Sequence, residues 1–529
     1  MSPGGRPRKE INVAVAFRVQ AGAYQDSVKL MRISAAGSAR SGVEVAVAVM
    51  ATETNLDNLA NAGFDPAVSA DASPNDLILA ARADAAEAAE AALDAMEAML
   101  SSAIASNGED DARPRTLRSA LDRRPDANLV LISVPGPNVR REAEAALNAG
   151  LHCMVFSDNV SVEDEIRLKR LADEKGLLLM GPDCGTALIG GKALAFANVV
   201  STGPVGIVGA SGTGIQAVSV LIDRLGSGVS HAIGTGGRDL SRAVGGRTML
   251  RGIRMLGEDE ATKVLLLVSK PPDPEVMKRV LEAASETGKP AVGIFLGGDA
   301  DAAAGTGVHA AGNLEEAARA AVALACGERP PSGGAEAAAE WTPWIEEERC
   351  RLAPGQRFIR GLFSGGTLCD EAMLILGERL ERIHSNLALE ESLRLADPNR
   401  SVGHTVVDLG EDFFTRGRPH PMIDPGMRNE RILREAGDPE TAVLLLDVVL
   451  GHGAHEDPAG SAAAAVREAV KIAAKAGRAL AVAASVCGTE GDPQTLSIQE
   501  AALRGAGVRV FPTNAQAARF SAALAGMIT

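Results

Sequence analysis

Two short turns combine glycines with hydroxyl side chains, and each lies between an apolar run and an amphipathic segment. Residues 209–214 (GASGTG) follow the apolar run 205–208, and residues 364–367 (SGGT) follow 358–363. Such a turn points backbone N–H groups outward at the positive end of a helix dipole, where phosphate, an acyl phosphate or a carboxylate binds. The residues that we expect to bind an anion here are Ser211, Gly212, Thr213, Gly214, Ser364, Gly365, Gly366 and Thr367.

Other glycine-rich turns follow other predicted strands. Residues 234–239 supply Gly236, Gly237 and Arg238 as further anion-binding candidates. Ligands of open α/β sheets bind beyond the carboxyl ends of the strands, so we expect these turns at the binding edges. Any single turn of this type also serves as an ordinary tight connection. The occurrence of the same kind of turn in two separate halves of the chain favours a binding role.

Three histidines and one cysteine have side chains that could take part in chemistry. His452 and His455 lie in an acidic, glycine-flanked loop, where they could hold a metal, exchange protons, contact phosphate or simply be solvated. No third metal ligand can be named, so we predict no metal site. His309 follows a glycine-rich stretch and is a further catalytic candidate. Cys184 could be a nucleophile, a lining residue or a small core residue, and the last interpretation is favoured.

The glycine turns do not match either common nucleotide motif. Residues 185–192 come nearest to a Walker A loop, but the lysine is one place late and Ala193 follows it. Residues 209–214 do not have the G-x-G-x-x-G spacing, and no acidic residue is placed to hold a ribose.

Length and composition indicate a protein of several α/β domains. At 529 residues the chain is expected to hold about three or four domains. Hydrophobic residues make up 46% but aromatic residues only 3%, which favours aliphatic cores of parallel sheets covered by helices. The net charge of −15 argues against nucleic acid and anionic membranes as partners. Six cysteines without a C-x-x-C pair, and no apolar run of 18 residues, predict a cytoplasmic protein with reduced thiols.

Alternating apolar runs and helical patterns predict the domain layout. Residues 1–112 form a small α+β domain after a basic leader at residues 1–10, and 113–202 form a Rossmann-like domain. Residues 203–327 and 351–529 form two flavodoxin-like domains with parallel sheets, joined by a linker at 328–350 that is rich in proline, glycine and small residues.

Residues 129–325 resemble the α subunit of succinyl-CoA synthetase. The similar motifs are VPGP at 134–137, GPDC at 181–184, VGIVGASGT at 205–213 and GTGGRD at 234–239. The last 170 or so residues resemble the carboxyl domain of the β subunit, beginning with GLFSGGTLCDEAM at 361–373. The whole layout resembles the FdrA family of acyl-CoA-synthetase-like proteins. The resemblance implies that the Rossmann-like domain 113–202 is of CoA-binding type, with a CoA site that includes Pro135, Gly136, Pro137, Gly181, Pro182, Asp183 and Cys184.

The chain also departs from the synthetase pattern. The glycine-rich CoA-binding turn has no counterpart at 17–24, and the phosphohistidine motif is matched only loosely around His309. The glutamate that supports this histidine is replaced by the sequence SKPP at 269–272, and no ATP-grasp segment accompanies the two synthetase-like parts. What remains is the pair of helix starts, with Lys270 and Arg238 as charge partners for an acyl phosphate.

The resemblance to the FdrA family implies an acyl-transfer subunit that works with companion subunits in an oligomer. The linked reaction is carbamoyl transfer between phosphate and oxamate, which is oxalurate phosphorolysis in allantoin breakdown. One alternative is an acid–CoA ligase that uses a separate ATP-binding partner. Another is a non-catalytic subunit that senses CoA or an acyl phosphate. We favour carbamoyl transfer and keep the other two functions as alternatives.

Overall fold

The computed structural model describes residues 14–527 except 24, 26, 53–54, 57–58, 61–62, 66–71, 74–75, 106–113, 115, 299, 332–337, 389 and 417. The predicted leader at residues 1–10 lies outside these residues, as does part of the predicted linker. Internal contacts divide the chain into two compact units, Met1–Arg113 with Thr415–Pro419, and Pro114–Phe414 with His420–Thr529.

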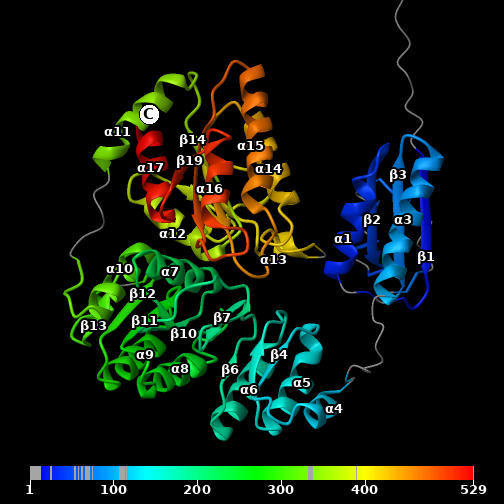
Figure 1. The fold of residues 1–529 in the computed structure, drawn as a ribbon. Helices are drawn as coiled ribbons and strands as arrows, with labels where there is room; N and C mark the ends of the chain where they lie inside the picture. The colour runs from blue at the N-terminus through cyan, green and yellow to red at the C-terminus, as the bar shows by residue number, and fades with distance from the viewer. Residues whose placement is uncertain are drawn as a thin grey trace, which may run out of the picture. The chain divides into compact units, whose positions relative to one another are not determined.

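The first unit contains a three-stranded antiparallel sheet in the order β1-β3-β2 (Figure 1). Alternating small and apolar residues in these strands give the sheet one face that packs against two helices. The core on that face contains Leu30, Ile33, Leu93 and Met96. The elements are β1 (Ala14–Gln20), α1 (Ser27–Ser38), β2 (Val43–Met50), β3 (Leu77–Ala83) and α3 (Ala86–Ala105).

The second unit begins with a three-stranded parallel sheet, β4-β5-β6. Ser161 caps helix α6 by accepting the N–H of Asp164, and Gly176 ends the helix with a φ of 68°. The elements are α4 (Leu117–Arg123), β4 (Leu129–Ile132), α5 (Gly136–Asn148), β5 (His152–Val155), α6 (Val162–Lys175) and β6 (Leu179–Met180).

A seven-stranded sheet follows, in the order β13-β12-β11-β9-β10-β7-β8. Its five parallel strands β9 to β13 have the strand order of flavodoxin-like folds, with the switch point between β9 and β11. The parallel sheet predicted for 203–327 did not include the hairpin β7–β8, which comes from the predicted domain 113–202. This hairpin adds antiparallel to β10 and turns at Gly190 and Gly191. The elements are β7 (Thr186–Ile189), β8 (Lys192–Ala195), β9 (Val205–Gly209), α7 (Gly212–Arg224), β10 (Val229–Gly234), α8 (Arg247–Glu258), β11 (Val264–Ser269), α9 (Pro274–Glu286), β12 (Ala291–Phe295), η2 (Ala300–Ala303), β13 (Val308–Ala310) and α10 (Leu314–Ala325).

The last sheet is six-stranded and parallel, in the order β15-β16-β14-β17-β18-β19. Strand β17 is buried along its whole length, as its apolar sequence predicts. The switch point of this sheet lies between β14 and β17. The elements are β14 (Phe358–Phe363), α12 (Gly366–Gly377), β15 (Ile383–His384), η3 (Glu391–Leu393), β16 (His404–Asp408), α13 (Asp412–Thr415), α14 (Gly426–Gly437), β17 (Thr441–Val449), α15 (Pro458–Lys475), β18 (Ala481–Cys487), α16 (Leu496–Arg504), β19 (Arg509–Phe511) and α17 (Asn514–Gly526).

The predicted linker 328–350 is not extended throughout. Its second half belongs to helix α11 (Ala338–Arg351). Trp341 and Ile345 of this helix are buried, and the Trp341 ring meets Phe511 edge-on at 5.5 Å. Burial of two large apolar side chains ties this segment to the C-terminal sheet.

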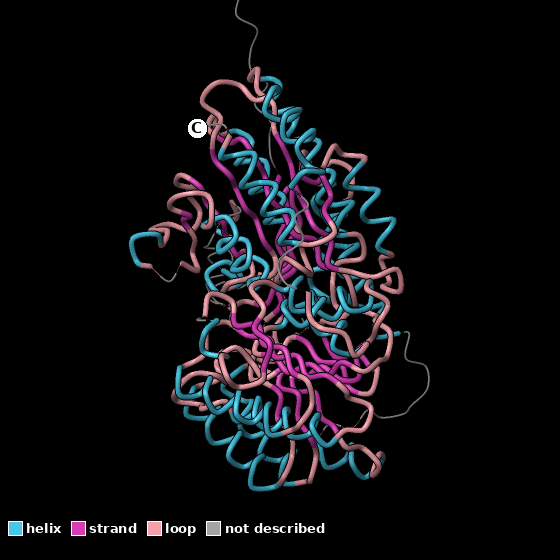
Figure 2. The backbone as a smooth tube through the Cα atoms, turned by 90° about the vertical axis from the view of Figure 1, so that its left-hand side faces the viewer, coloured by secondary structure: helices cyan, strands magenta, loops and turns pink. Residues whose placement is uncertain are grey.

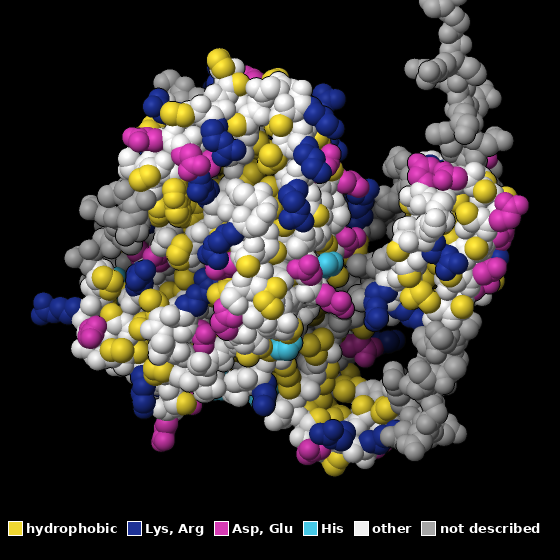
Figure 3. All heavy atoms as spheres, turned by 45° about the horizontal axis from the view of Figure 1, so that its top comes forward, with side chains coloured by type: hydrophobic (Ala, Val, Ile, Leu, Met, Phe, Trp, Pro, Cys, Tyr) yellow, Lys and Arg dark blue, Asp and Glu magenta, His cyan; other side chains and the backbone are white. Residues whose placement is uncertain are grey.

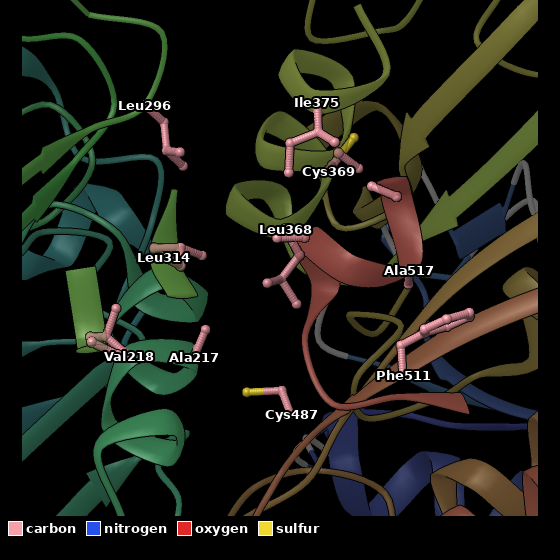
Figure 4. Close-up of a cluster of buried hydrophobic side chains, with 14 of the residues drawn as sticks. Ala217, Val218, Leu296, Leu314, Leu368, Cys369, Ile375, Cys487, Phe511 and Ala517 are labelled. Atoms are coloured by element: carbon pink, nitrogen blue, oxygen red, sulfur yellow. The ribbon is translucent and has the colours of Figure 1, made fainter. Parts of the chain in front are cut away.

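One continuous apolar core joins the last two sheets. In Figure 2 helices flank the strands, and Figure 4 shows where helices of the two domains meet. Val218 and Leu314 face Leu368 and Phe511 across this junction, and all four belong to one buried cluster. Because the two domains share this core, the loops where they face each other are held in fixed positions relative to one another.

Candidate functional site

The two predicted anion-binding turns come together. They start helices α7 and α12, and the hydroxyl groups of Ser211 and Thr367 form a short hydrogen bond between them. Ser211 also caps its own helix by accepting the N–H of Gly214 at 3.0 Å. The N–H of Thr367 points to the Thr213 hydroxyl at 3.4 Å. The pairing that the sequence suggested across the two halves of the chain is therefore present in the fold.

Glycine is required where the two turns touch. A Cβ at Gly365 would lie 2.9 Å from the Thr213 methyl group, and one at Gly214 would lie 2.9 Å from Val268 and 3.1 Å from Thr367. A Cβ at less than 3.0 Å from a carbon neighbour would force that neighbour to shift, so side chains of the opposite turn and of β11 pack directly on the backbone at these two glycines.

A buried carboxylate of the protein already occupies part of the second turn. Asp447, fully buried on β17, accepts the N–H groups of Ser364 and Gly365, both at 2.8 Å. Arg428 of α14 donates to the Ser364 hydroxyl at 2.8 Å and to the Asp447 carbonyl oxygen at 2.7 Å, and lies 3.4 Å from its carboxylate. Ser364 and Gly365 were expected to bind a ligand, but their backbone N–H donors are used inside the protein.

Lys270 adds a positive charge at the same place. It directly follows β11 and forms an ion pair with Asp370 of α12 at 2.7 Å, while half of its side chain stays exposed. Burial lowers the pKa of Lys270, but the Asp370 carboxylate outweighs this effect, so the pKa lies above its ordinary value. Lys270 is therefore an ammonium group at neutral pH.

The accessible part of the paired turns is a rim made by Gly212, Thr213 and Gly366, with Lys270 beside it. These residues are partly or fully exposed, whereas Ser211 and Thr367 beneath them are buried. The first N–H groups of a helix lack intrahelical partners, so this rim presents donors to solvent from two helices. We call it the anion rim below.

Asp408 is a residue of this site that the sequence analysis missed. It ends β16, is 7% exposed, and accepts the N–H of Gly410 through Oδ1 at 2.8 Å. Its Oδ2 points to Gly366, where a Cβ would come within 2.7 Å of it. Burial raises the pKa of Asp408 to about 7, and the nearby carboxylates of Asp370 and Asp447 add to this effect.

The predicted histidines lie elsewhere. His309 lies on the edge strand β13 and pairs with Val292 of β12. The pairing of the strands between them places His309 at the same height in the sheet as Ile207 of β9. Three strand spacings separate it from β9, which is about 14 Å. The structure therefore does not bring His309 to the anion rim.

His452 and His455 shape the loop after β17. The N–H of His452 donates to Ala197 at 2.8 Å, and Nδ1 of His455 accepts the N–H of Asp457 at 3.0 Å. No group of at least three His, Cys, Asp or Glu residues that could hold a metal occurs among the described residues. A catalytic role for either histidine stays a prediction.

The glycine loop with Gly236, Gly237 and Arg238 is fixed by a buried charge network. Lys169 of α6 donates to Thr235 O at 3.0 Å and Asp239 at 2.8 Å, and pairs with Glu165 at 2.9 Å. Arg238 pairs with Glu165 at 3.1 Å and donates to Val160 O at 2.7 Å. Arg238 is thus held by a carboxylate of its own protein and is not at the anion rim.

The predicted CoA loops converge at the carboxyl edge of β4, β5 and β6. Ser157, which the sequence analysis missed, accepts the N–H of Val134 through its hydroxyl at 2.9 Å and that of Asp183 through its carbonyl at 2.9 Å. The other residues predicted there are Pro135, Gly136, Pro137, Gly181, Pro182 and Cys184.

The backbone encloses part of this loop cluster. A Cβ at Gly136 would clash with the backbone of Asn159, so the chain itself covers the start of α5. Burial, with Asp158 and Asp412, raises the pKa of Asp183 to about 6, and Arg238 opposes this shift. Charges of both signs therefore lie near these loops, and no step is derived through CoA at this position.

Cys184 is a core residue. It is buried, its sulfur lies 3.4 Å from Gly234 O, and burial raises its pKa to about 12. A thiol that stays protonated is a poor nucleophile. The favoured sequence interpretation is confirmed.

The surface shows no single charge sign on the face drawn in Figure 3, where basic and acidic side chains are interspersed. Within the described part of the chain, no helix combines the length and apolar character that crossing a bilayer needs.

Three family models match the chain. The CoA-ligase model matches residues 362–524, and the CoA binding domain model matches 200–297. The latter falls on the β9–β12 sheet and not on 113–202, so CoA binding by 113–202 stays a prediction. The chain thus contains domains similar to those of acid–CoA ligases of the succinyl-CoA synthetase type.

The third model, described as AllF, heavy metal-associated domain, matches residues 13–115. Heavy metals prefer thiolate and imidazole ligands. Residues 13–115 contain neither cysteine nor histidine. The residues present do not fit a heavy-metal site, and no function of this domain is derived from a metal.

Solved structures with similar folds include the apo dinucleotide-forming acetyl-coenzyme A synthetase 1 of Ca. Korarchaeum cryptofilum. It is 18% identical, with a TM-score of 0.29, over 76% of this chain and 83% of that chain. The ATP citrate lyase of Methanothrix soehngenii, solved with citrate and coenzyme A, is 16% identical with a TM-score of 0.34 over 42% and 45%. TM-scores of this size carry no argument about the site.

Curated relatives of two kinds match the sequence. Succinate–CoA ligase [ADP-forming] subunit alpha 2 of Archaeoglobus fulgidus is 31% identical over 183 residues, which span 33% of this chain and 61% of that protein. The uncharacterized protein YahF of Escherichia coli is 46% identical over 496 residues, which span 94% of this chain and 96% of that protein. At this identity and coverage, the chain belongs to the same family as YahF.

Proposed function

We propose that this chain is an acyl-transfer subunit that works through an acyl phosphate bound at the anion rim, with carbamoyl transfer between phosphate and oxamate as its reaction. The observation that carries the proposal is the contact of the α7 and α12 N-termini through Ser211 and Thr367. This contact brings unpaired helix donors from two domains to one accessible place. Two helix N-termini and an ammonium group suit a ligand with two or more negative charges.

The rim residues have distinct roles in this proposal. The N–H groups of Gly212, Thr213 and Gly366 hold the phosphate oxygens. Lys270 neutralises charge that develops on the oxygen leaving or entering the carbamoyl carbon. In oxalurate phosphorolysis, a phosphate oxygen attacks the carbamoyl carbon, the C–N bond breaks, and the oxamate nitrogen takes up a proton.

The position of His309 supports direct transfer over a phosphohistidine route. At about 14 Å from β9, it is too far from the rim for in-line attack on a phosphate bound there. Carbamoyl phosphate needs neither a phosphohistidine nor an ATP site for its transfer, so the distance is no obstacle to this reaction.

The test measures oxalurate phosphorolysis by the full chain isolated with the subunits that copurify with it. Lys270→Met should lower kcat/KM about 100- to 1,000-fold, as expected for loss of one charge-stabilising donor. Lys278→Met, which removes an exposed lysine of α9, is the matched control and should stay within about twofold. His309→Ala should retain activity. Absence of turnover in the complete complex, or loss of activity in His309→Ala, would contradict the proposal.

The family matches favour a second candidate, an acid–CoA ligase that uses an ATP-binding partner and CoA. Its support is the CoA-ligase and CoA binding domain matches together with the succinate–CoA ligase relative. Transfer of the γ-phosphoryl group of labelled ATP to the wild-type chain, but not to His309→Ala, would favour this candidate over carbamoyl transfer.

A further inference from the structure

We propose that Asp408 is the proton-exchanging catalytic residue of the anion rim: the rim binds a doubly charged oxyanion while the Asp408 carboxyl is protonated, and this proton passes to the leaving group. The inference rests on the proposed function, since it concerns the same rim. It adds a residue that the sequence motifs do not contain.

The geometry aims one oxygen of Asp408 at the rim. Oδ1 is engaged by the N–H of Gly410 at 2.8 Å, and the backbone of Asp408 is fixed by Asn386 through bonds of 2.9 and 3.0 Å. Oδ2 accepts no hydrogen bond from the described residues, and it lies beside Gly366, the first residue of α12. A side chain more than nine-tenths buried thus turns a free oxygen toward the accessible end of a helix.

The charge state of this oxygen decides what the rim can bind. An ionised Asp408 would lie in contact with an oxyanion bound at Gly366, and the two negative charges would repel each other. A protonated Asp408 instead donates a hydrogen bond to the same oxyanion. With its pKa raised to about 7, mainly by burial, both forms are populated near neutral pH.

Four titratable side chains face Asp408 from neighbouring elements, and each differs from it in charge or in partner. Lys270 after β11 stays an ammonium, because its pKa is raised. The Cys369 thiol of α12 stays neutral, because burial raises its pKa well above the ordinary value. Burial also raises the pKa of Asp370 of α12 and of Asp447 of β17. Each carboxylate has a positive partner that opposes this shift, Lys270 for Asp370 and Arg428, with two backbone N–H groups, for Asp447.

His420 is the remaining titratable neighbour. Its Nδ1 accepts the N–H of Met422 at 3.2 Å, so Nε2 carries the hydrogen in the neutral ring. Nε2 faces Gly410, where a Cβ would clash with it and lie 3.1 Å from Asp408 Oδ1. Burial lowers the pKa of His420 to about 4, so the ring stays neutral from pH 6 to pH 9. Glu371 of α12 also has a pKa raised to about 7 by burial, but its carboxylate accepts hydrogen bonds from the N–H of Leu314 and the Asn514 amide, which are not part of the anion rim. A pH effect near 7 that Asp408→Asn removes therefore belongs to Asp408.

The proton has a defined place in the reaction. In oxalurate phosphorolysis the phosphate oxygen forms a bond to the carbamoyl carbon, and the electron pair of the breaking C–N bond moves to the oxamate nitrogen. Protonated Asp408 gives its proton to that nitrogen and becomes a carboxylate. The proton that the attacking hydrogen phosphate carried then passes to this carboxylate, so carbamoyl phosphate leaves as a dianion and Asp408 is protonated again. In the reverse direction the carboxylate takes the proton back from the attacking nitrogen.

The test uses sulfate as the probe, because sulfate stays a dianion between pH 6 and pH 8.5. Binding to the full-length protein is measured by calorimetry at both pH values. Because only the protonated form is competent, wild-type affinity should be about 30-fold weaker at pH 8.5 than at pH 6. Asp408→Asn keeps the shape and a donor but cannot ionise, so its affinities should agree within about threefold. It should also lose about 100-fold or more in kcat for phosphorolysis.

The matched control is Asp424→Asn. Asp424 is exposed and accepts the N–H of Gly426 in the same two-residue turn that Asp408 forms with Gly410. It should keep the wild-type pH dependence. A wild-type pH dependence in Asp408→Asn would overturn the inference alone. No sulfate binding by the wild type at pH 6 would overturn the anion rim, and with it both the inference and the proposed function.

Discussion

Replacing Arg428 by methionine should strongly destabilise the C-terminal sheet. The side chain is buried, and its Nη1 donates to the Ser364 hydroxyl and the Asp447 carbonyl and lies 3.4 Å from the Asp447 carboxylate. Methionine fills a similar volume but leaves a fully buried carboxylate without its positive partner. Breaking a buried ion pair on one side costs about 3–5 kcal/mol.

The loss should depend on pH. Burial raises the pKa of Asp447 in the folded protein above its unfolded value, against the opposing effect of Arg428. A carboxyl with a raised folded pKa favours folding most below the unfolded pKa of about 3.9, and this advantage disappears as the pH rises through the folded pKa. Without Arg428 the folded pKa rises further, so Arg428→Met should lose more stability between pH 5 and pH 8 than the wild type.

The assay follows tryptophan fluorescence during urea unfolding. The chain has two tryptophans, Trp341 and Trp344, and both lie on α11, where their rings contact Phe511 of β19. Their fluorescence therefore reports on the sheet that contains Asp447. The double variant Arg428→Met/Asp447→Asn removes both charges and should be far more stable than the sum of the two single losses implies. Additive losses, or a loss below about 1 kcal/mol in Arg428→Met, would refute the reasoning.

Three further outcomes follow from the described contacts. Gly365→Ala should destabilise the protein by about 1–3 kcal/mol and weaken sulfate binding, because its Cβ would press on Thr213 at 2.9 Å; an unchanged urea midpoint and affinity would contradict the close approach of the turns. Lys169→Met should cost about 3–5 kcal/mol in urea unfolding, because Glu165 and Asp239 lose their buried partner, and the exposed Lys175→Met should cost little. Iodoacetamide at pH 7.5 should label exposed Cys326 and Cys350 but leave Cys184 unlabelled in peptide mass spectra; fast labelling of Cys184 would contradict its burial.

Much of the fold could be predicted from local patterns. The apolar run of β17 and the alternation in β2 mark strands, and the glycine turn at 209–214 marks the start of α7. The hairpin β7–β8 was missed because its strands have only four residues each, too few for a clear period. The helical half of the predicted linker was missed because the surrounding prolines and glycines outweighed the apolar Trp341 and Ile345.

The sequence predicted the glycine turns of the site but not the buried charged side chains that surround them. A turn of glycines and hydroxyl side chains can be recognised from its local sequence alone. The same kind of turn occurs at 209–214 and at 364–367, and this recurrence suggested that the two turns act together. Asp408 and Arg428 gain their roles from partners that lie 42 and 19 residues away, Gly366 and Asp447, and no local pattern encodes such partners. Asp447 does leave a signal, since one carboxylate within the apolar run AVLLLDVVL must be buried with a partner.

That buried carboxylate explains why the two halves of the site are not equivalent. On α7 a hydroxyl caps the helix and leaves Gly212 and Thr213 at the surface, whereas on α12 Asp447 consumes the N–H groups of Ser364 and Gly365. A second dianion at the α12 turn would have to displace a fully buried charge that Arg428 holds in place. In the proposed function the rim therefore binds one oxyanion, held by the free N–H groups of the two helix starts. A single bound phosphate suits transfer of an acyl group better than transfer of a phosphoryl group between two anion sites.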